Sequence, residues 1–336
     1  MDGKGFNKSN KNEVRVLNSA VKIQKQKNSE ILQDSKKLNR RKRIKENIPL
    51  LLMFSPIIVY YLIFRYGPMF GIVIAFQDFN LFDGYLKSPW VGLKYFKMIF
   101  TMPQTLDVIK NTFFLAILKV VVTFPFPILL ALLLNEVRKM WFKRTIQTLV
   151  YLPHFLSWVI VGGMVVTIFS QETGVINSII SKVTGEPYPF LFKPVSWTMI
   201  FIGSGIWKEA GFSAIIYLSA LSSIDPSLYE AASIDGANKF KQIMNITLPG
   251  IRSIIVLMMI LSIGQITEVS FDQIYMLRNS AVDSISDVIS TYVYRLGLQG
   301  AQYSLTAAMG LFQSILSLIL VFSANSIAKK FDQSLW

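Results

Sequence analysis

Polar and aromatic side chains that interrupt long apolar stretches are the residues whose types and spacing could bind a ligand. One stretch contains two aromatic residues and an acid close together: Trp207, Glu209 and Phe212. Another contains polar residues at steps of three, three and four, which puts them on one stripe of a helix: Ser262, Gln265, Glu268 and Asp272. Carboxylate, amide and hydroxyl groups form hydrogen bonds with ligand hydroxyls, and aromatic faces cover apolar C–H faces. Both sets are therefore candidates to line a ligand pathway.

A structural role is the alternative for each of these residues. Ser262 and Gln265 have side chains that can hydrogen-bond a neighbouring helix inside a membrane. Lys208 and Glu209 are sequence neighbours, which do not face each other on a helix, so we expect each to have a partner elsewhere. His154 follows a proline and is predicted to form hydrogen bonds at a helix kink rather than to bind a metal.

The composition indicates a membrane protein rather than a soluble one. Only 16% of the 336 residues are charged, against about 25% in ordinary soluble proteins, and 52% are apolar or aromatic. The chain has no cysteine and one histidine, so we expect neither a disulfide framework nor a metal site. The sequence contains no Gly-x-x-x-x-Gly-Lys-Ser/Thr loop for nucleotide phosphates, so an ATP-driven role would need a partner chain, and we expect no cofactor in this one.

Six stretches are apolar enough, and long enough at roughly 20 residues or more, to cross a bilayer as helices. Helices are expected because an unpaired backbone polar group is too costly in hydrocarbon. The stretches are Ile48–Phe76 with a break expected at Gly67-Pro68, Asn111–Asn135 with Lys119 inside, Thr145–Gln171, Pro194–Ile224, Ile251–Leu277 and Gln302–Ala328. The predicted fold class is therefore an all-α integral membrane protein with six transmembrane helices.

Positive charge is concentrated at the N-terminus and in alternate connecting segments. Residues 1–46 contain 14 Lys or Arg and 5 Asp or Glu, and we expect a largely disordered tail facing an anionic leaflet of the lipid bilayer. With that tail inside, the inner segments hold 23 Lys or Arg and the outer segments 7, which predicts that the N- and C-termini are cytoplasmic. The basic residues precede an apolar body instead of lying among aromatics on a folded surface, so nucleic acid is not an expected partner.

The segment between the fourth and fifth stretches has the local chemistry of a short, capped helix. Asp225-Pro226 is a strong helix start, because the carboxylate caps the first turn and the proline ring fixes φ. The helix is predicted to extend to Asp235, with the small pair Ala231-Ala232 at its centre and Gly236 as a left-handed terminator. A second helix is expected from about Asn238. A short rigid helix held between two membrane spans is suited to fit a groove of another protein.

This segment resembles a known family. Glu230-Ala231-Ala232, three residues, Gly236, nine residues, Ile246, one residue and Leu248-Pro249 match the E-A-A-x3-G-x9-I-x-L-P signature of bacterial ABC importer permeases. Residues 107–330 resemble the core of type I importer permeases, which implies that type I fold. The resemblance implies that the loop helix 225–236 couples to an ATPase through Tyr229, Glu230, Ala231, Ala232, Asp235 and Gly236.

Softer patterns, such as Tyr66-Gly67-Pro68-Met69 and Tyr151-Leu152-Pro153-His154, are similar to polysaccharide-type sugar permeases of that family. The resemblance implies a multi-pass subunit of the bacterial cell membrane that imports an oligosaccharide or polysaccharide fragment. The implied partners are a second homologous permease, two ATPases that bind ATP and Mg²⁺, and an extracellular solute-binding protein. Counted from the E-A-A motif, the Trp207, Glu209 and Phe212 set lies where maltose-type permeases place sugar contacts, although such relatives have a small residue in place of Glu209.

The predicted organisation has four parts: the tail 1–46, the first transmembrane helix with an extracellular loop at 47–106, a five-helix core at 107–330 and the C-terminal tail 331–336. Two other functions compete with the permease. A membrane-embedded transferase would use Glu209, Glu268 or Asp272 as a general base, but dispersed carboxylates and a single histidine disfavour it. An ion-coupled carrier would show repeated halves or rings of charge, and the sequence contains neither.

Overall fold

The described part of the chain is almost entirely helical. The computed structural model describes residues 47–264 and 271–330. Within these ranges the only extended pairing is one antiparallel bridge between Gln77 and Trp90, so the all-α fold class is confirmed. The predicted tails and the predicted pathway residues Gln265 and Glu268 lie outside the described residues. The chain forms two compact units, Met1–Phe70 and Gly71–Trp336.

The first predicted span changes helix type along its length. It is α-helical over 47–61, then forms a π-helical turn, η1 (Leu62–Tyr66), and a 3₁₀ helix, η2 (Gly67–Phe76). Pro68 has no N–H to donate, which interrupts the α-helical hydrogen bonds near this position. The break expected at Gly67-Pro68 is therefore present as a change of helix type inside one span, Asn47–Phe76.

The second span is longer than predicted. α4 (Pro103–Thr123) and α5 (Pro125–Glu136) together form one apolar span. Proline at the first helical position starts both helices, because the N–H that it lacks has no partner there in any case. The helix begins at Pro103, before the apolar stretch predicted from about Asn111, and its added first turns contain the exposed pair Asp107 and Lys110, 3.3 Å apart.

The third predicted span is not one straight helix. α6 (Met140–Tyr151) continues into a 3₁₀ turn, η3 (Leu152–Phe155), and α7 (Trp158–Phe169) follows at an angle of 102°. Pro153 interrupts the α-helical hydrogen bonds, and the hydroxyl of Ser157 then caps α7. The kink expected next to Pro153 is therefore present, but it is a much larger change of direction than a kink within one span.

The fifth predicted span is also bent, whereas the sixth is a single helix. A helical run made of α11 (Lys239–Gln242), the π-helical turn η4 (Ile243–Thr247) and α12 (Leu248–Gly250) meets α13 (Arg252–Gly264) at 63°. α14 (Phe271–Leu277) ends the predicted stretch. α17 (Tyr303–Lys329) matches the sixth prediction to within one residue at each end. The described residues thus contain four unbroken spans, and six if each bent pair counts as one.

α9 (Pro194–Leu221) is the central helix of the second unit and matches the predicted fourth span. It packs against α4, α5, α6, α7, α13 and α14. Near its start Trp197 is fully buried, and its indole N–H donates to the carbonyl of Leu277 at 2.8 Å. Near its middle, Gly211 lies so close to α6 that a Cβ there would overlap the backbone carbonyl of Val150.

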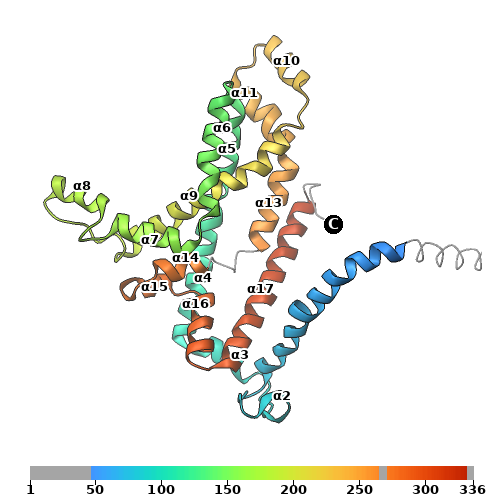
Figure 1. Cartoon of the computed structure of the whole chain (residues 1–336), viewed down its shortest axis with the longest axis vertical. Helices are drawn as coiled ribbons and strands as arrows, with labels where there is room; N and C mark the ends of the chain where they lie inside the picture. The colour runs from blue at the N-terminus through green and yellow to red at the C-terminus, as the bar shows by residue number, and fades with distance from the viewer. Residues whose placement is uncertain (1–46, 265–270, 331–336) are drawn as a thin grey trace, which may run out of the picture. The chain divides into compact units, whose positions relative to one another are not determined.

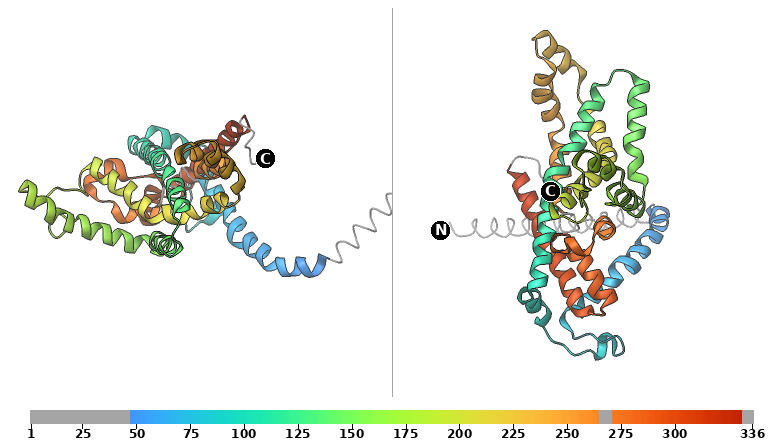
Figure 2. Two further views of the ribbon diagram at one scale, coloured as in Figure 1. Left: turned by 90° about the horizontal axis from the view of Figure 1, so that it is seen from above. Right: turned by 90° about the vertical axis from the view of Figure 1, so that its left-hand side faces the viewer.

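Several short helices in the connecting segments lie toward opposite ends of the second unit, whereas α8 (Val175–Thr184) projects to one side (Figures 1 and 2). One end has α10 (Pro226–Ile234), at the top of Figure 1. The other end has α2 (Gly84–Lys87), α3 (Lys94–Thr101), α15 (Asp283–Ser286) and α16 (Ile289–Val293). This separation fits connecting segments that lie alternately on the two faces of a membrane.

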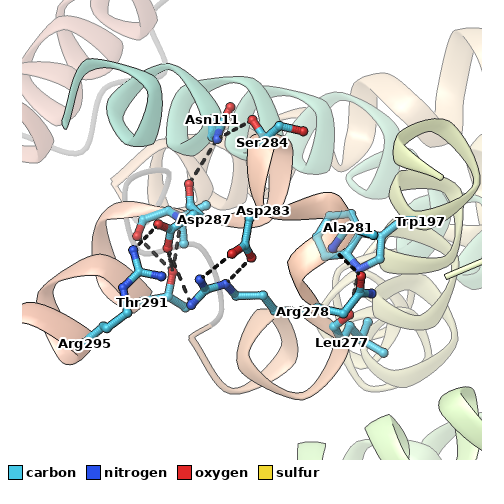
Figure 3. A network of polar contacts seen from close by, with 12 residues as sticks. Asn111, Trp197, Leu277, Arg278, Ala281, Asp283, Ser284, Asp287, Thr291 and Arg295 are labelled. Atoms are coloured by element: carbon cyan, nitrogen blue, oxygen red, sulfur yellow. Dashed lines mark hydrogen bonds and ion pairs between the residues drawn. The ribbon is translucent and has the colours of Figure 1, made fainter. Parts of the chain in front are cut away.

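Polar contacts around Arg278 fix the segment that follows α14 (Figure 3). Arg278 donates to both carboxylate oxygens of Asp283, at 2.7 and 3.0 Å, and these hydrogen bonds raise the pKa of Arg278. Arg295 pairs with Asp287. Asn111 of α4 donates its amide to the carbonyl of Asp287 and to a second carbonyl of this segment. The two ion pairs thereby fix the conformation of segment 278–295, and the Asn111 amide holds this segment against α4.

We predict that Gly211→Ala destabilises the membrane domain, while Gly203→Ala in the same helix does not. The added methyl group at position 211 must displace a backbone carbonyl, which costs about 1–3 kcal/mol. At position 203 it meets open space, and alanine improves helix propensity by up to about 1 kcal/mol. Thermal unfolding of the two purified variants in one detergent checks this. Equal melting temperatures would contradict the close approach of α9 and α6.

Candidate functional site

The first candidate site is the loop helix α10, whose two ends are capped as the sequence predicts. The Asp225 carboxylate accepts a hydrogen bond from the N–H of Ser227 at 2.9 Å, and this bond lowers the pKa of Asp225. At the other end Gly236 has φ +77°, the left-handed conformation that reverses the chain. The N–H of Ala237 then bonds to the carbonyl of Ala232 at 2.8 Å, which completes the terminating turn.

Two side-chain hydrogen bonds attach α10 to the helical run that leads into the fifth span. The hydroxyl of Tyr229 lies 3.0 Å from the hydroxyl of Thr247, in η4. The amide of Gln242 donates to the hydroxyl of Ser233 at 2.9 Å. Both bonds join α10 to residues of the same run, so α10 is attached directly to the base of the fifth span.

α10 has no buried residue and presents an exposed surface. Of the six residues predicted to couple to an ATPase, Glu230, Ala231, Asp235 and Gly236 are exposed, and Tyr229 and Ala232 are partly buried. Apolar side chains of the same loop are also exposed: Leu228, Ile234, Phe240 and Met244. A capped, rigid helix with exposed apolar side chains is suited to bury that surface against another protein.

The second candidate site is a cleft among α4, α5, α9 and α13, with a cavity volume of about 120 Å³. Two predicted pathway residues, Glu209 and Ser262, line it together although they come from different spans. The other polar residues in the wall are Lys119, Thr123, Ser213 and Tyr217. The structure therefore brings one residue of the predicted fourth-span set and one of the fifth-span set to the same cleft.

Glu209 belongs to a charged cluster at the break of the third span. One carboxylate oxygen lies 2.7 Å from Nδ1 of His154, and the other lies 3.2 Å from Nζ of Lys208. Lys208 is buried, and its ammonium also donates to the backbone carbonyl of His154 at 2.7 Å. The prediction that Lys208 and Glu209 have partners elsewhere is confirmed. The prediction that they do not face each other is wrong, because the ends of both long side chains reach His154 at the break of the third span and contact each other there.

The aromatic members of the first set lie apart from each other. Phe212 stacks on the ring of His154 with ring centroids 3.9 Å apart, so it supports the charged cluster. Trp207, about half exposed, lines a different and mainly apolar pocket between α7 and α9, with Val165 and Phe190. His154 is a hydrogen-bonding residue at a bend, as predicted.

The predicted stripe on the fifth span is only partly described. Ser262 donates its hydroxyl to the carbonyl of Met258 in its own helix while lining the cleft. Asp272 is exposed at the start of α14 and does not line the cleft. Lys119 lines the cleft, although it was not among the predicted pathway residues. It was visible as a cation inside an apolar span, and charges in spans are costly enough to indicate function.

Comparisons with known proteins agree with this architecture. A family model described as "Binding-protein-dependent transport system inner membrane component" matches residues 123–336. Protein LplB of Bacillus subtilis (strain 168) is 43% identical over 311 residues, which cover 93% of this chain and 98% of LplB. The polygalacturonan/rhamnogalacturonan transport system permease protein YteP of the same organism is 47% identical over 284 residues, covering 84% of this chain and 88% of YteP.

A solved structure is similar over most of the chain. It is the crystal structure of a bacterial ABC transporter involved in the import of the acidic polysaccharide alginate, with a TM-score of 0.80 and 43% identity, covering 86% of this chain and 98% of that one. Bent spans around a cleft, with a capped helix between two of them, define a multi-pass transport permease. The chain belongs to the family of binding-protein-dependent transport system inner membrane components.

We predict that Lys208 and Glu209 stabilise the fold as a coupled pair. Glu209→Gln leaves the buried ammonium without its counter-ion, and Lys208→Met removes the lysine cation that pairs with the carboxylate. Breaking a buried pair costs about 3–5 kcal/mol, and the partly exposed Glu209 reduces that to about 1–3 kcal/mol. A double-mutant cycle of unfolding free energies in detergent measures the coupling. Additive losses in the double variant would show that the pair contributes nothing.

Proposed function

We propose that this chain forms half of the translocation pathway of an ATP-driven importer for oligosaccharides or polysaccharide fragments. The observation on which this rests is α10, capped at both ends, hydrogen-bonded to the fifth span and located between two spans that line one cleft. A saccharide cargo is supported by the similar alginate importer and by the similar permease YteP, which belongs to a polygalacturonan/rhamnogalacturonan transport system. The chain itself acts as a transport subunit, and ATP and Mg²⁺ are bound by the partner ATPases.

The expected partners follow from two features that this chain cannot complete alone, the cleft and the exposed surface of α10. A cleft lined by one subunit is half of a pathway, so a second homologous permease supplies the other half. α10 fits a groove on one of two ATPase subunits through Glu230 and the residues around it. A solute-binding protein delivers the saccharide from outside, in line with a related alginate importer solved with a pentasaccharide-bound periplasmic protein.

The geometry supports a mechanical connection between the ATPase, through α10, and the cleft proposed to hold the sugar. ATPase closure moves α10, and α10 is joined at one end to α9 and through Tyr229 to η4. η4 leads into the 63° bend before α13, so the movement reaches Met258 and Ser262 in the cleft wall. Because α9 and α13 line the same cleft, a displacement of their shared loop changes the width of that cleft.

We predict that Gly236→Arg uncouples ATP hydrolysis from sugar uptake while the membrane fold remains intact. An arginine is strained at φ +77° and disturbs the end of α10 at the ATPase surface. Gly185→Arg is the matched control, because Gly185 also ends a short helix at positive φ, +86°, with open space around it, but in the connection between the third and fourth spans. Sugar uptake should fall at least tenfold in the first variant and remain near wild type in the second. Normal uptake and assembly with Gly236→Arg would contradict the coupling role.

We predict that α10 and the termini face the cytoplasm. The chain has no cysteine, so a single introduced thiol reports its own location. A membrane-impermeant maleimide should label Glu186→Cys in intact cells, and Lys241→Cys only after permeabilisation, since both positions are exposed but belong to connections on opposite faces. The reverse pattern would invert the orientation and remove α10 from any cytoplasmic ATPase.

A further inference from the structure

The connection between the first and second spans, residues 77–102, exposes large apolar side chains at the end of the second unit opposite α10 (Figure 1). Leu81, Phe82 and Leu86, which lie in α2 and just before it, form the apolar tip of this loop, and they are 65%, 95% and 99% exposed. Single exposed apolar residues are ordinary on a protein surface. Three large ones in one short loop indicate a surface that is covered in the membrane-bound protein.

The loop that carries the apolar tip is held by hydrogen bonds across its base. An antiparallel bridge between Gln77 and Trp90 closes that base. The amide of Gln77, which is buried, donates to the carbonyl of Tyr85 at 2.9 Å, and the hydroxyl of buried Ser88 accepts from the N–H of Asn80 at 3.1 Å. These bonds join the base to both sides of the apolar tip, so the exposure of its side chains is a property of the folded loop.

The same loop is attached to the starts of two spans. The N–H of Phe79 donates to the hydroxyl of Ser304 in the first turn of α17 at 2.9 Å, and the Phe79 ring meets the edge of the Tyr303 ring, with centroids 6.0 Å apart. Asp78 pairs with Lys94 of α3, and α3 packs against both α17 and α4. Because α17 and α4 each begin an apolar span here, the loop lies at the boundary of the bilayer.

The side chains around the apolar tip are of the types found where acyl chains meet water. Tyr85 and Trp90 are each more than half exposed, and tyrosine and tryptophan are enriched at that boundary. Residues 77–102 contain three lysines and two aspartates, and Lys87 and Lys97 are exposed. Ammonium groups at this level are attracted to lipid phosphates. Apolar, aromatic and basic side chains in one loop therefore match the chemistry of a lipid surface.

The size of the apolar tip favours lipid over a second protein as its cover. A stable protein interface buries about 800 Å² per partner over about 20–30 residues. Even if each of the three residues of the tip buried as much as an aromatic side chain, about 150–250 Å², the total would fall short of that area. A bilayer needs no such area, because the flanking spans already hold the loop at its surface.

We propose that the apolar tip inserts into the bilayer leaflet on the face opposite α10, and that Lys87 pairs there with lipid phosphates. Acyl chains then cover Leu81, Phe82 and Leu86. Through Phe79 and α3 the inserted loop anchors the start of the sixth span in that leaflet. This lipid anchor is independent of the cargo and of the proposed sugar uptake.

The test measures the depth of single nitroxide labels in the complete complex of permeases and ATPases, in liposomes of phosphatidylethanolamine and phosphatidylglycerol. Phe82→Cys and Leu86→Cys are labelled one at a time, since the chain has no cysteine of its own. Oxygen concentrates among acyl chains, whereas a water-soluble nickel chelate remains outside them. We expect the ratio of oxygen to nickel accessibility to be at least tenfold higher at both positions than at Glu186→Cys, an exposed control in another connection. The unsubstituted chain in the same complex gives the background from partner chains.

The contribution of charge is tested with the label at Leu86→Cys. Lys87→Glu should lower the accessibility ratio at least twofold, because a carboxylate is repelled by the phosphates of phosphatidylglycerol. Lys182→Glu, at an exposed lysine of α8, is the matched control and should leave the ratio unchanged. An unchanged ratio in Lys87→Glu would overturn the phosphate contact.

The other outcomes at the two tip positions would overturn the lipid anchor. Nickel accessibility as high as at the control would place the apolar tip in water. Low accessibility to both reagents would show that a protein chain covers it. A solute-binding protein added from outside should leave both accessibilities unchanged, and a fall in both would make the tip a docking surface for that protein instead. Because none of these measurements uses a sugar, a failure of the proposed transport function would leave their result unaffected.

Discussion

The arrangement of the candidate pathway depends on two contacts of the buried Lys208 ammonium group, one with a backbone carbonyl and one with a carboxylate. A helix broken inside a membrane must satisfy its backbone groups without water, and Lys208 donates to the carbonyl of His154 at the break of the third span. The same ammonium pairs with Glu209, which in turn bonds to the imidazole of His154. One cation therefore holds the bend against α9 and fixes the orientation of an acid in the cleft wall.

Local signals in the sequence predicted most of the fold. Hydropathy located the fourth and sixth spans to within a few residues, and Asp225, Pro226 and Gly236 located both ends of α10, because capping depends on neighbouring residues alone. A kink next to Pro153 was expected, but the sizes of the two bends and the presence of the second one were not, because hydropathy contains no information on the direction of a helix. Pro153 and Ser157 mark one bend in the sequence, but its angle of 102° depends on packing against α9.

The candidate site was harder to predict, since it is made by residues from different spans. Glu209 and Ser262 were correctly identified as polar residues in apolar stretches, and only the fold shows that they line one cleft. Trp207, two residues before Glu209, faces a different pocket because successive positions on a helix differ by about 100°, whereas Phe212, three residues after it, shares the neighbour His154 with Glu209. Lys208 and Glu209 contact each other against the simple helical rule, since the rule describes Cβ positions and not the ends of long, flexible side chains.

The length of the second span has a consequence for the membrane itself. Its 34 residues make a rod of about 51 Å, against a hydrocarbon core of about 30 Å. Such a rod must lean or extend beyond the acyl chains, and the exposed pair Asp107 and Lys110 in its first turns fits extension into the headgroup layer. A mismatch between this span and the bilayer thickness therefore costs free energy that depends on the tilt of the helix. Lipids with shorter or longer tails should change the energy of any tilting step during transport.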